Sequence, residues 1–220
     1  VTKEVIKEVP VDKIVKEEVV KTVEVEVEKV VIATPSAFEA KAIDQASDGR
    51  YGGTLKTVSQ ASIGTIDPIS SSAWVAWAVS TQIYDVPFAS DGSFAIKPQM
   101  VDTWSISDDG LVWTFNNRAD LEWHDGDAVT AEDFEATLLR AFDSYSVGWK
   151  ELGARSTVKV VDNDTWSLNF TEPFGLVFDA MNFNTEGFPI QKKSIIKDTP
   201  AERGGGVLKE HVGSGPYQFK

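Results

Sequence analysis

The sequence contains no cysteine among its 220 residues, so neither a disulfide framework nor a zinc–thiolate site can form. Its two histidines, His124 and His211, lie far apart along the chain, which argues against a histidine-rich metal centre. The acidic run at residues 162–164 lacks the spaced oxygen ligands and the distal glutamate of an EF-hand calcium loop. We therefore expect no metal site and no cofactor.

Basic residues are scarce as well, with 21 Lys and Arg against 34 Asp and Glu and a formal net charge of -13. Phosphate binding needs clustered basic side chains, so nucleic acid is not an expected partner. The chain has no run of about 18 apolar residues, and no membrane span is predicted within it. It also lacks a phosphate-binding loop with its lysine and a Gly-x-Ser-x-Gly nucleophile elbow.

Residues 1–32 differ in composition from everything that follows. They consist almost wholly of Val, Ile, Lys and Glu, in an approximate Lys-Glu-Val repeat interrupted by Pro10. Alternation from Val23 to Glu28 indicates a strand, whereas Lys and Glu favour helix, so the local signals conflict. We interpret the segment as a tether, with a coiled-coil or strand-swapping oligomerisation segment as the alternative. Residues 33–50, rich in Ala, Ser and Asp, are expected to be a linker.

A globular domain is predicted from Tyr51 onward. The chain is 42% hydrophobic and 10% aromatic, which is enough for a large core. A strand is expected at residues 52–58, then an Asp-Pro turn at Asp67 and a helix over residues 73–84. Core packing is the simplest interpretation of its two tryptophans, Trp74 and Trp77. Alternating apolar residues predict two hairpins, with strands at residues 102–106 and 111–115, and at 158–161 and 165–170.

Shorter segments follow these hairpins or lie between them. The patterns predict a loop at residues 144–153, a short helix at 173–182, a short strand at 188–190, a helical turn at 192–196 and the start of a strand at 217–219.

Residues 121–142, LEWHDGDAVTAEDFEATLLRAF, carry the clearest local signals. Residues 121–124 alternate as a strand does, and Asp-Gly-Asp supplies a tight turn. Thr130 and Asp133 are spaced as a capping box that begins a helix. Negative charge lies at the start of this helix and Arg140 at its end, which suits the helix dipole. Its apolar residues form one stripe, so we expect one face to pack on the core.

The same turn carries the residues that could act in acid–base catalysis. Glu122, Asp125 and Asp127 could supply paired carboxylates, and His124 lies beside Asp125. The two aspartates are better explained by side-chain to backbone hydrogen bonds in a turn. The sequence contains no nucleophile constellation. We therefore predict that the protein is not an enzyme.

The order of motifs resembles the family-5 extracytoplasmic solute-binding proteins, the receptors of peptide- and nickel-type ABC importers. The motifs are GGTLKTV, TIDP, SDDGLVWTFNNRADLEWHDGDAVTAEDF, VKVVDNDTWSLNFTEP, FPI and GSGPYQF. The resemblance extends from about Tyr51 to Lys220, and its most specific part leads into His124-Asp125-Gly126. The leader at residues 1–32 also resembles the tether that some lipid-anchored or exported members carry.

The resemblance implies a mixed α/β fold: the N-terminal part of a two-lobed clamshell with an inserted β-rich domain. It implies a receptor that captures peptides or similar small solutes between the lobes and delivers them to the permease subunits of an ABC transporter. The expected division places most of the second lobe after residue 220. Within the chain, the first lobe comprises residues 51–71 and 157–220, and the inserted domain comprises residues 72–156.

By resemblance, the loop after the Asp-Pro turn lines the cleft, the inserted domain approaches it after residue 142, and the closing Gly-Pro motif lies near the hinge. Each position also has a plain structural explanation, as core, loop packing or a turn before a strand. The candidate ligand-binding residues are Ser71, Ser72, Trp74, Tyr145, Trp149, Gly215 and Tyr217.

The resemblance further implies a monomer in the periplasm or another extracytoplasmic compartment. The chain begins with Val1, and we expect that processing or truncation removed the true start, where a signal or lipid segment would allow anchoring. Oligopeptide, dipeptide, nickel chelate and oligosaccharide all remain open as ligands. The alternative function is a non-transport surface scaffold or adhesive module that self-associates through residues 1–32.

Overall fold

The computed structural model describes residues 54, 56–181, 188–197, 208 and 210–220, which belong to one compact unit, Glu39–Lys220. The predicted tether at residues 1–32 and the linker at residues 33–50 lie outside the described residues. Within the described ranges, no helix is long and apolar enough to cross a membrane.

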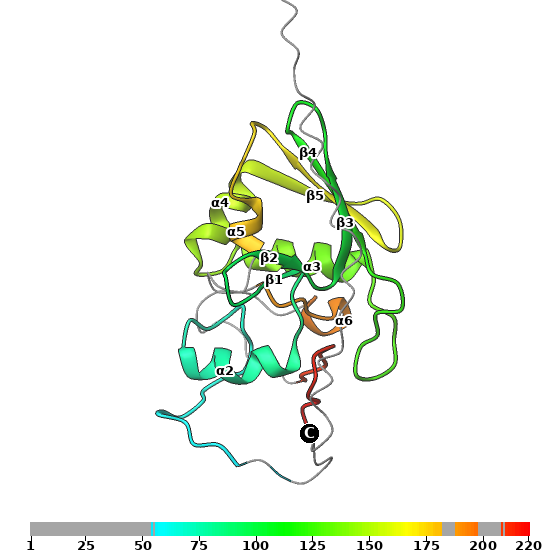
Figure 1. Ribbon diagram of the computed structural model, residues 1–220. Helices are drawn as coiled ribbons and strands as arrows, with labels where there is room; N and C mark the ends of the chain where they lie inside the picture. Colours follow the sequence, from blue (N-terminus) through cyan, green and yellow to red (C-terminus); the bar gives the residue numbers. More distant parts are fainter. Residues whose placement is uncertain (1–53, 55, 182–187, 198–207, 209) are drawn as a thin grey trace, which may run out of the picture. The chain divides into compact units, whose positions relative to one another are not determined.

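The largest sheet has four antiparallel strands in the order β3-β4-β6-β5 (Figure 1). Each of the two predicted hairpins is present, and β4 pairs with β6 to join them. A smaller hairpin turns at residues 91–95. The strands are β1 (Phe88–Ser90), β2 (Ile96–Pro98), β3 (Val101–Ile106), β4 (Val112–Asn117), β5 (Ser156–Val160) and β6 (Thr165–Phe170).

Aromatic side chains bury one face of the four-stranded sheet. Phe115 of β4 and Trp166 of β6 are partners in register, and their rings stack with centroids 4.3 Å apart. Phe134, from helix α3 (Ala131–Phe142), stacks on Trp166 at 5.3 Å. All three side chains are fully buried. The sheet and α3 therefore share one hydrophobic core, which fixes the orientation of α3.

Helix α3 begins where the sequence predicts. Thr130 is its N-cap, and a capping box links Thr130 with Asp133: the Thr130 backbone N–H donates to the Asp133 carboxylate at 2.9 Å. The preceding residues 121–124 do not form the expected strand. They contribute only an isolated bridge, between Glu122 and Ala128, because the turn at residues 125–127 reverses the chain at once.

The other helices are α2 (Trp74–Ile83), α4 (Val147–Arg155), α5 (Val177–Met181) and α6 (Lys193–Ile196). Helix α4 corrects the loop predicted at residues 144–153. Its two glycines lower helix propensity, but Gly153 is needed for packing, since an added Cβ would lie 2.4 Å from the Phe142 ring. Close approach of α3 and α4 therefore selects glycine where local propensity disfavours it.

Three of the predicted strands do not form among the described residues. The chain forms no strand in the described part of residues 52–58, at residues 188–190 or at residues 217–219. Ile190 instead donates one backbone hydrogen bond to Asp85, and Tyr217 donates one to Gln82. A strand needs a neighbouring ladder, and the described residues provide none for these segments.

The predicted lobe boundary at residues 156/157 falls inside the four-stranded sheet. Strand β5 begins at Ser156 and pairs with β6, which in turn pairs with β4. One buried hydrophobic cluster also extends from Ile69 to Ile190, across both sides of this boundary. The division into a first lobe and an inserted domain stays a prediction.

Candidate ligand-binding site

The loop from Asp67 to Ala73 leads into α2 and has a fixed course. The carboxylate of Asp67 accepts the Ile69 backbone N–H at 3.2 Å, and the Ser70 hydroxyl donates to the Asp67 carbonyl at 3.4 Å. These local bonds are typical of the Asx and ST turns that Asp and Ser form. The turn predicted at Asp67 is confirmed; residues 68–70 are buried, and the chain reaches the surface at residues 72–74.

The Ser71 carbonyl is the second anchor of this loop. It accepts the indole N–H of Trp77 at 2.9 Å and the hydroxyl of Tyr145 at 3.0 Å. Trp77 lies on α2, whereas Tyr145 lies between α3 and α4. One carbonyl therefore ties together two of the predicted site regions, although they are 74 residues apart in sequence.

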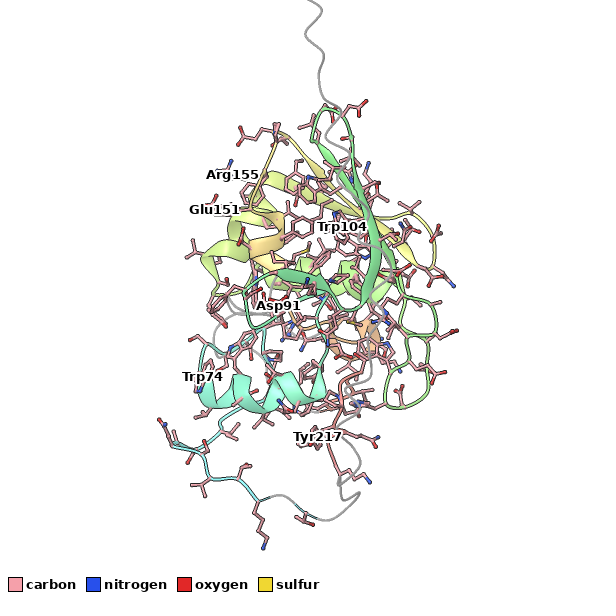
Figure 2. The ribbon with its side chains drawn as sticks, viewed as in Figure 1. Trp74, Asp91, Trp104, Glu151, Arg155 and Tyr217 are labelled. Carbon is pink, nitrogen blue, oxygen red and sulfur yellow. The ribbon has the colours of Figure 1, made fainter. Side chains whose placement is uncertain are left out.

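Ser72 and Trp74 lie beyond this anchor and are exposed. The side chain of Trp74 is 80% exposed, at the N-terminal end of α2 (Figure 2). The prediction that both tryptophans of this helix pack in the core is right for Trp77, which is 7% exposed, and wrong for Trp74. Exposing a tryptophan forgoes the burial of a large apolar surface. An aromatic in this position is available for contact with another molecule.

A hollow of about 600 Å³ opens beside Tyr145. Trp149 also borders it, but its side chain is 2% exposed and its indole N–H donates to the Ala180 carbonyl at 3.2 Å. Trp149 therefore supports the wall from inside the core. The residues that line the hollow come from α4, α5 and the segments before them: Tyr145, Ser146, Val147, Gly148, Trp149, Glu151, Arg155, Phe174, Leu176, Asp179 and Ala180.

Several of the charged side chains around this hollow form ion pairs with one another. Arg155 and Glu151, labelled in Figure 2, form an ion pair at 3.3 Å, and Arg155 forms a second ion pair with Glu172. The same guanidinium lies 5.8 Å from the centroid of the Phe174 ring. A guanidinium already paired with two carboxylates and resting on an aromatic ring offers little net positive charge. Asp179 adds a further carboxylate to the lining, so the hollow has no net positive charge and does not favour an anion.

Gly215 and Tyr217 lie at the opposite end of α2. Their backbone N–H groups donate to the carbonyls of Ile83 and Gln82, at 2.8 and 2.9 Å. An added Cβ on Gly215 would lie 2.8 Å from the Ile83 carbonyl carbon, so glycine permits this close contact. The rise of 1.5 Å per residue places this end about 13 Å from Trp74. The structure thus brings together the predicted sites around residues 71–74 and 145–149, but not those at 215 and 217.

His124 connects the turn at residues 125–127 with this C-terminal segment. Its backbone N–H donates to the Gly213 carbonyl at 2.8 Å, and its Nε2 lies 2.7 Å from the Gly215 carbonyl oxygen. A carbonyl only accepts, so Nε2 carries the proton. His124 therefore has a structural role, in holding residues 213–215.

The turn aspartates are likewise occupied. Lys192 donates to the carboxylates of Asp125 and Asp127, at 2.6 and 2.5 Å. The hydrogen bond from Lys192 lowers the pKa of Asp125. Burial opposes the charged form of Lys192, but the two carboxylates outweigh it and raise the pKa of the lysine. These contacts join the turn to the segment before α6. No group of three or more potential metal-binding side chains was found among the described residues.

Sequence reasoning missed the buried polar cluster beneath the Asp67 loop. The expectation that Arg140 lies at the helix end is right, but its side chain is 7% exposed and binds Asp67 and Gln191 instead of solvent. One sequence signal was available: Thr137 lies three residues after Phe134 and three before Arg140, so it shares a helix face with both; in the structure it is fully buried. Two polar residues on the inward stripe of α3 indicate a polar partner inside the core.

The sequence profile of the bacterial extracellular solute-binding proteins, family 5 (middle region), matches residues 95–220, more than half of the chain. The chain belongs to this family. A probable peptide ABC transporter periplasmic-binding protein, y4tO of Sinorhizobium fredii, is 32% identical over 166 residues, which are 74% of this chain and 30% of that protein. The dipeptide-binding protein DppE of Bacillus subtilis is 31% identical over 139 residues, 56% of this chain and 25% of DppE.

Solved structures of other solute-binding proteins agree with this assignment. MoaA of Agrobacterium, solved with mannopinic acid, has a TM-score of 0.59 at 27% identity, over 71% of this chain and 32% of MoaA. Such family-5 proteins have a two-lobed clamshell fold, and the mixed α/β unit described above corresponds to part of it. The chain spans about a third or less of the length of the relatives it matches.

Proposed function

We propose that this family-5 chain forms part of the substrate-binding receptor of an ABC importer. The proposal rests on the loop of residues 67–74, whose Ser71 carbonyl is held by Tyr145, a residue that lines the hollow. Ser72 and Trp74 follow this anchor and are exposed. A rigid loop and a few exposed aromatic and polar groups beside a concavity are the features of a small-molecule site. In this proposal Ser71, Ser72, Trp74 and Tyr145 form the ligand face.

The ligand that we propose is a peptide or a similar small, neutral or zwitterionic solute. Relatives are named for peptides and dipeptides, and a solved neighbour holds mannopinic acid. Trp74 offers apolar area together with an indole N–H, which suits ligands with both apolar and polar parts. The paired charges of Arg155 beside the hollow add little attraction for an anion.

In the full-length protein, the ligand face would form one wall of a cleft and a second lobe would close over it. Closure is driven only by the difference in ligand affinity between the open and closed states. The closed receptor would then dock on permease subunits outside the cytoplasm. In the same proposal Gly215 and Tyr217 act near the hinge, Trp149 supports the cleft wall, and the protein is a monomer that catalyses no reaction.

Native mass spectrometry of the full-length gene product, purified without denaturation, tests the proposal. We expect a monomer with a discrete added mass that disappears on denaturation and that identifies the ligand. Peptides of two to five residues, added as mixtures, should raise the melting temperature. No adduct and no thermal shift would overturn the receptor proposal, and self-association that requires residues 1–32 would favour the scaffold alternative.

A further inference from the structure

A buried cluster of four polar side chains lies directly beneath the loop that presents Ser72 and Trp74. Arg140 donates to both carboxylate oxygens of Asp67, at 2.9 and 2.5 Å, and to the side-chain carbonyl of Gln191 at 2.7 Å. The Gln191 amide in turn donates to Asp67 at 3.1 Å. The Thr137 hydroxyl accepts the backbone N–H of Gln191 at 3.0 Å and donates to the Gln191 backbone carbonyl at 3.1 Å.

The cluster draws its members from three separate parts of the chain. Asp67 precedes α2, Arg140 and Thr137 lie on α3, and Gln191 precedes α6. Asp67 is fully buried, and Arg140 and Gln191 are 7% and 1% exposed. Asp67 therefore has its position fixed by groups that lie well outside its own loop.

Stability alone is a weak reason for such a cluster. Removing two charges from water costs about as much as their attraction returns, and well-packed apolar residues often replace a buried ion pair without loss. What the bidentate pair adds is geometry, because a planar guanidinium accepts a carboxylate in one orientation. A feature with little net contribution to stability and a strong orienting effect calls for a role in positioning.

The group being oriented is the backbone of the ligand loop. The same carboxylate that Arg140 holds also accepts the Ile69 N–H, so the guanidinium fixes the start of the loop through Asp67. The end of the loop is fixed at the Ser71 carbonyl, by Trp77 and Tyr145. Only residues 68–70 lie between the anchors at Asp67 and Ser71. The intervening backbone therefore has little freedom before a ligand binds.

We propose that Arg140 is a positioning residue for ligand binding: it acts through Asp67 to hold residues 68–72 in the binding conformation, without contacting the ligand. This inference rests on the proposed receptor function. Ordering a loop in advance removes an entropic cost from binding, so affinity should fall when the loop is released. Arg140 is distinct from the predicted contact residues because its side chain is enclosed by the protein.

The test compares three variants of the full-length protein: Arg140→Lys, Arg140→Met, and the double variant Asp67→Asn with Arg140→Met. Lysine keeps the charge but cannot form the bidentate pair. Methionine alone leaves the Asp67 carboxylate buried without its cation, so this variant should be the least stable. The double variant removes both charges and should recover most of the melting temperature.

Amide hydrogen exchange of the ligand-free proteins is the first readout. We expect exchange at residues 69–73 to rise roughly tenfold in the double variant, while exchange in β4 and β6 stays close to wild type. Leu168→Ala is the matched control, because it destabilises the core of β6 away from the loop. Unchanged exchange at residues 69–73 in all three Arg140 variants would overturn the inference, whether or not the protein is a receptor.

Ligand affinity is the second readout, with the peptide mixture that raises the wild-type melting temperature as the probe. The double variant should bind roughly tenfold more weakly despite its recovered stability, and Arg140→Lys should fall between it and wild type. The Leu168→Ala control should keep wild-type affinity below its unfolding temperature. Loss of loop protection without loss of affinity would overturn the positioning role. A wild-type protein that binds no probe would count against the receptor function itself, while the exchange result still decides the loop geometry.

Discussion

Helices α2 and α3 are close in length but are specified in opposite ways. Helix α3 has a capping box, two acidic residues in its first turn and an apolar stripe that packs on the sheet. Helix α2 has no side-chain hydrogen bond at its N-cap, Ala73, and no charged residue in its first or last turn. Its apolar residues point both ways, so that Trp77 is buried and Trp74 exposed.

The contrast between the two helices indicates where the candidate site lies. Local signals are strong in α3, because its cap, its first-turn charges and its apolar stripe all favour the same helix and the same packing on the sheet. They are weak in the helix that presents the ligand loop, where Trp74 lies at the surface at a cost in buried area. Places where residue type and burial disagree are expected at functional sites.

The largest loss of stability is expected from a substitution in the core between α3 and the sheet. Replacing Phe134 by alanine removes a fully buried ring that stacks on Trp166, and the free energy of unfolding should fall by about 3–5 kcal/mol. Urea denaturation of the 220-residue chain measures the change. Leu139→Ala is the control on the same helix, since Leu139 is 52% exposed, and it should change stability by no more than about 0.5 kcal/mol.

Replacement of an exposed aromatic residue of α2 by alanine should change the free energy of unfolding very little. Trp74→Ala removes a larger side chain than Phe134→Ala does, yet Trp74 is 80% exposed. We expect a change within about 0.5 kcal/mol. A loss comparable to that of Phe134→Ala in the same denaturation experiment would show that Trp74 packs in the core and would remove it from the ligand face.

The caps of the two helices give the next effect. Thr130→Ala removes the N-cap of α3 and its hydroxyl contact with Asp133 at 3.2 Å. Stability should fall by about 1 kcal/mol. Thr130→Ser is the control, because serine caps a helix as well and should restore most of the loss. Equal losses for both substitutions would mean that the methyl group, not the hydroxyl, carries the contribution.

The converse experiment adds a cap to α2. Ala73 already has the extended backbone of an N-cap residue, with φ −71° and ψ 121°. Ala73→Asp should therefore stabilise the chain by about 0.5–1 kcal/mol, since an aspartate there can accept backbone N–H groups and complement the helix dipole. Ala78→Asp, at an exposed position inside the helix, is the control and should give no gain. A loss of stability in Ala73→Asp would contradict the description of this helix end.

The last prediction concerns how stability depends on pH at the C-terminal end of α2. Burial lowers the pKa of His211 below its ordinary 6.5, although the nearby Asp67 carboxylate opposes the shift. Burial also raises the pKa of Tyr84, so the phenol keeps its proton and donates to Nδ1 of neutral His211 at 3.1 Å. A lowered folded-state pKa means that the unfolded chain binds the proton first on acidification.

The contribution of His211 is therefore complete above pH 6.5 and is lost as the pH falls through its folded-state pKa. The melting temperature of wild type should decrease between about pH 7 and pH 5 by more than that of His211→Gln. Tyr84→Phe removes the donor and should reduce the same dependence. Parallel melting curves for wild type and His211→Gln across this range would contradict the assigned role of the histidine.

The sequence predicted those elements whose signals are local. The two hairpins of the sheet and the start of α3 follow from alternation, turn residues and the capping box. Helix α4 was missed because Gly153 is selected by contact with Phe142, a tertiary cause that a propensity cannot report. Residues 217–219 read as a strand from their composition alone, but no described segment pairs with them.

The candidate site could be predicted only in part, for the same reason. The turn at Asp67 and the likeness to receptor motifs pointed to residues 71–74, but not to the hydrogen bond between Tyr145 and the Ser71 carbonyl. The buried role of Arg140 was hidden because an arginine at a helix end already has a local explanation in the helix dipole. Sequence patterns indicate local structure such as turns and helix ends. The hydrogen-bond partners that come from distant parts of the chain are seen only in the structure.

The most direct test of the ligand face uses the absence of cysteine from the chain. Ser72→Cys places a thiol on the exposed loop, and Ser105→Cys places one on exposed β3, away from the hollow; labelling is read from the peptide that carries each residue, where no other thiol is present. Each variant of the full-length protein is labelled with a maleimide, with and without the peptide mixture that raises its melting temperature. We predict that the peptides slow labelling at residue 72 roughly tenfold, as burial under a ligand would, and leave residue 105 unchanged. Equal labelling at residue 72 with and without a stabilising peptide would contradict the assignment of this loop to the binding site.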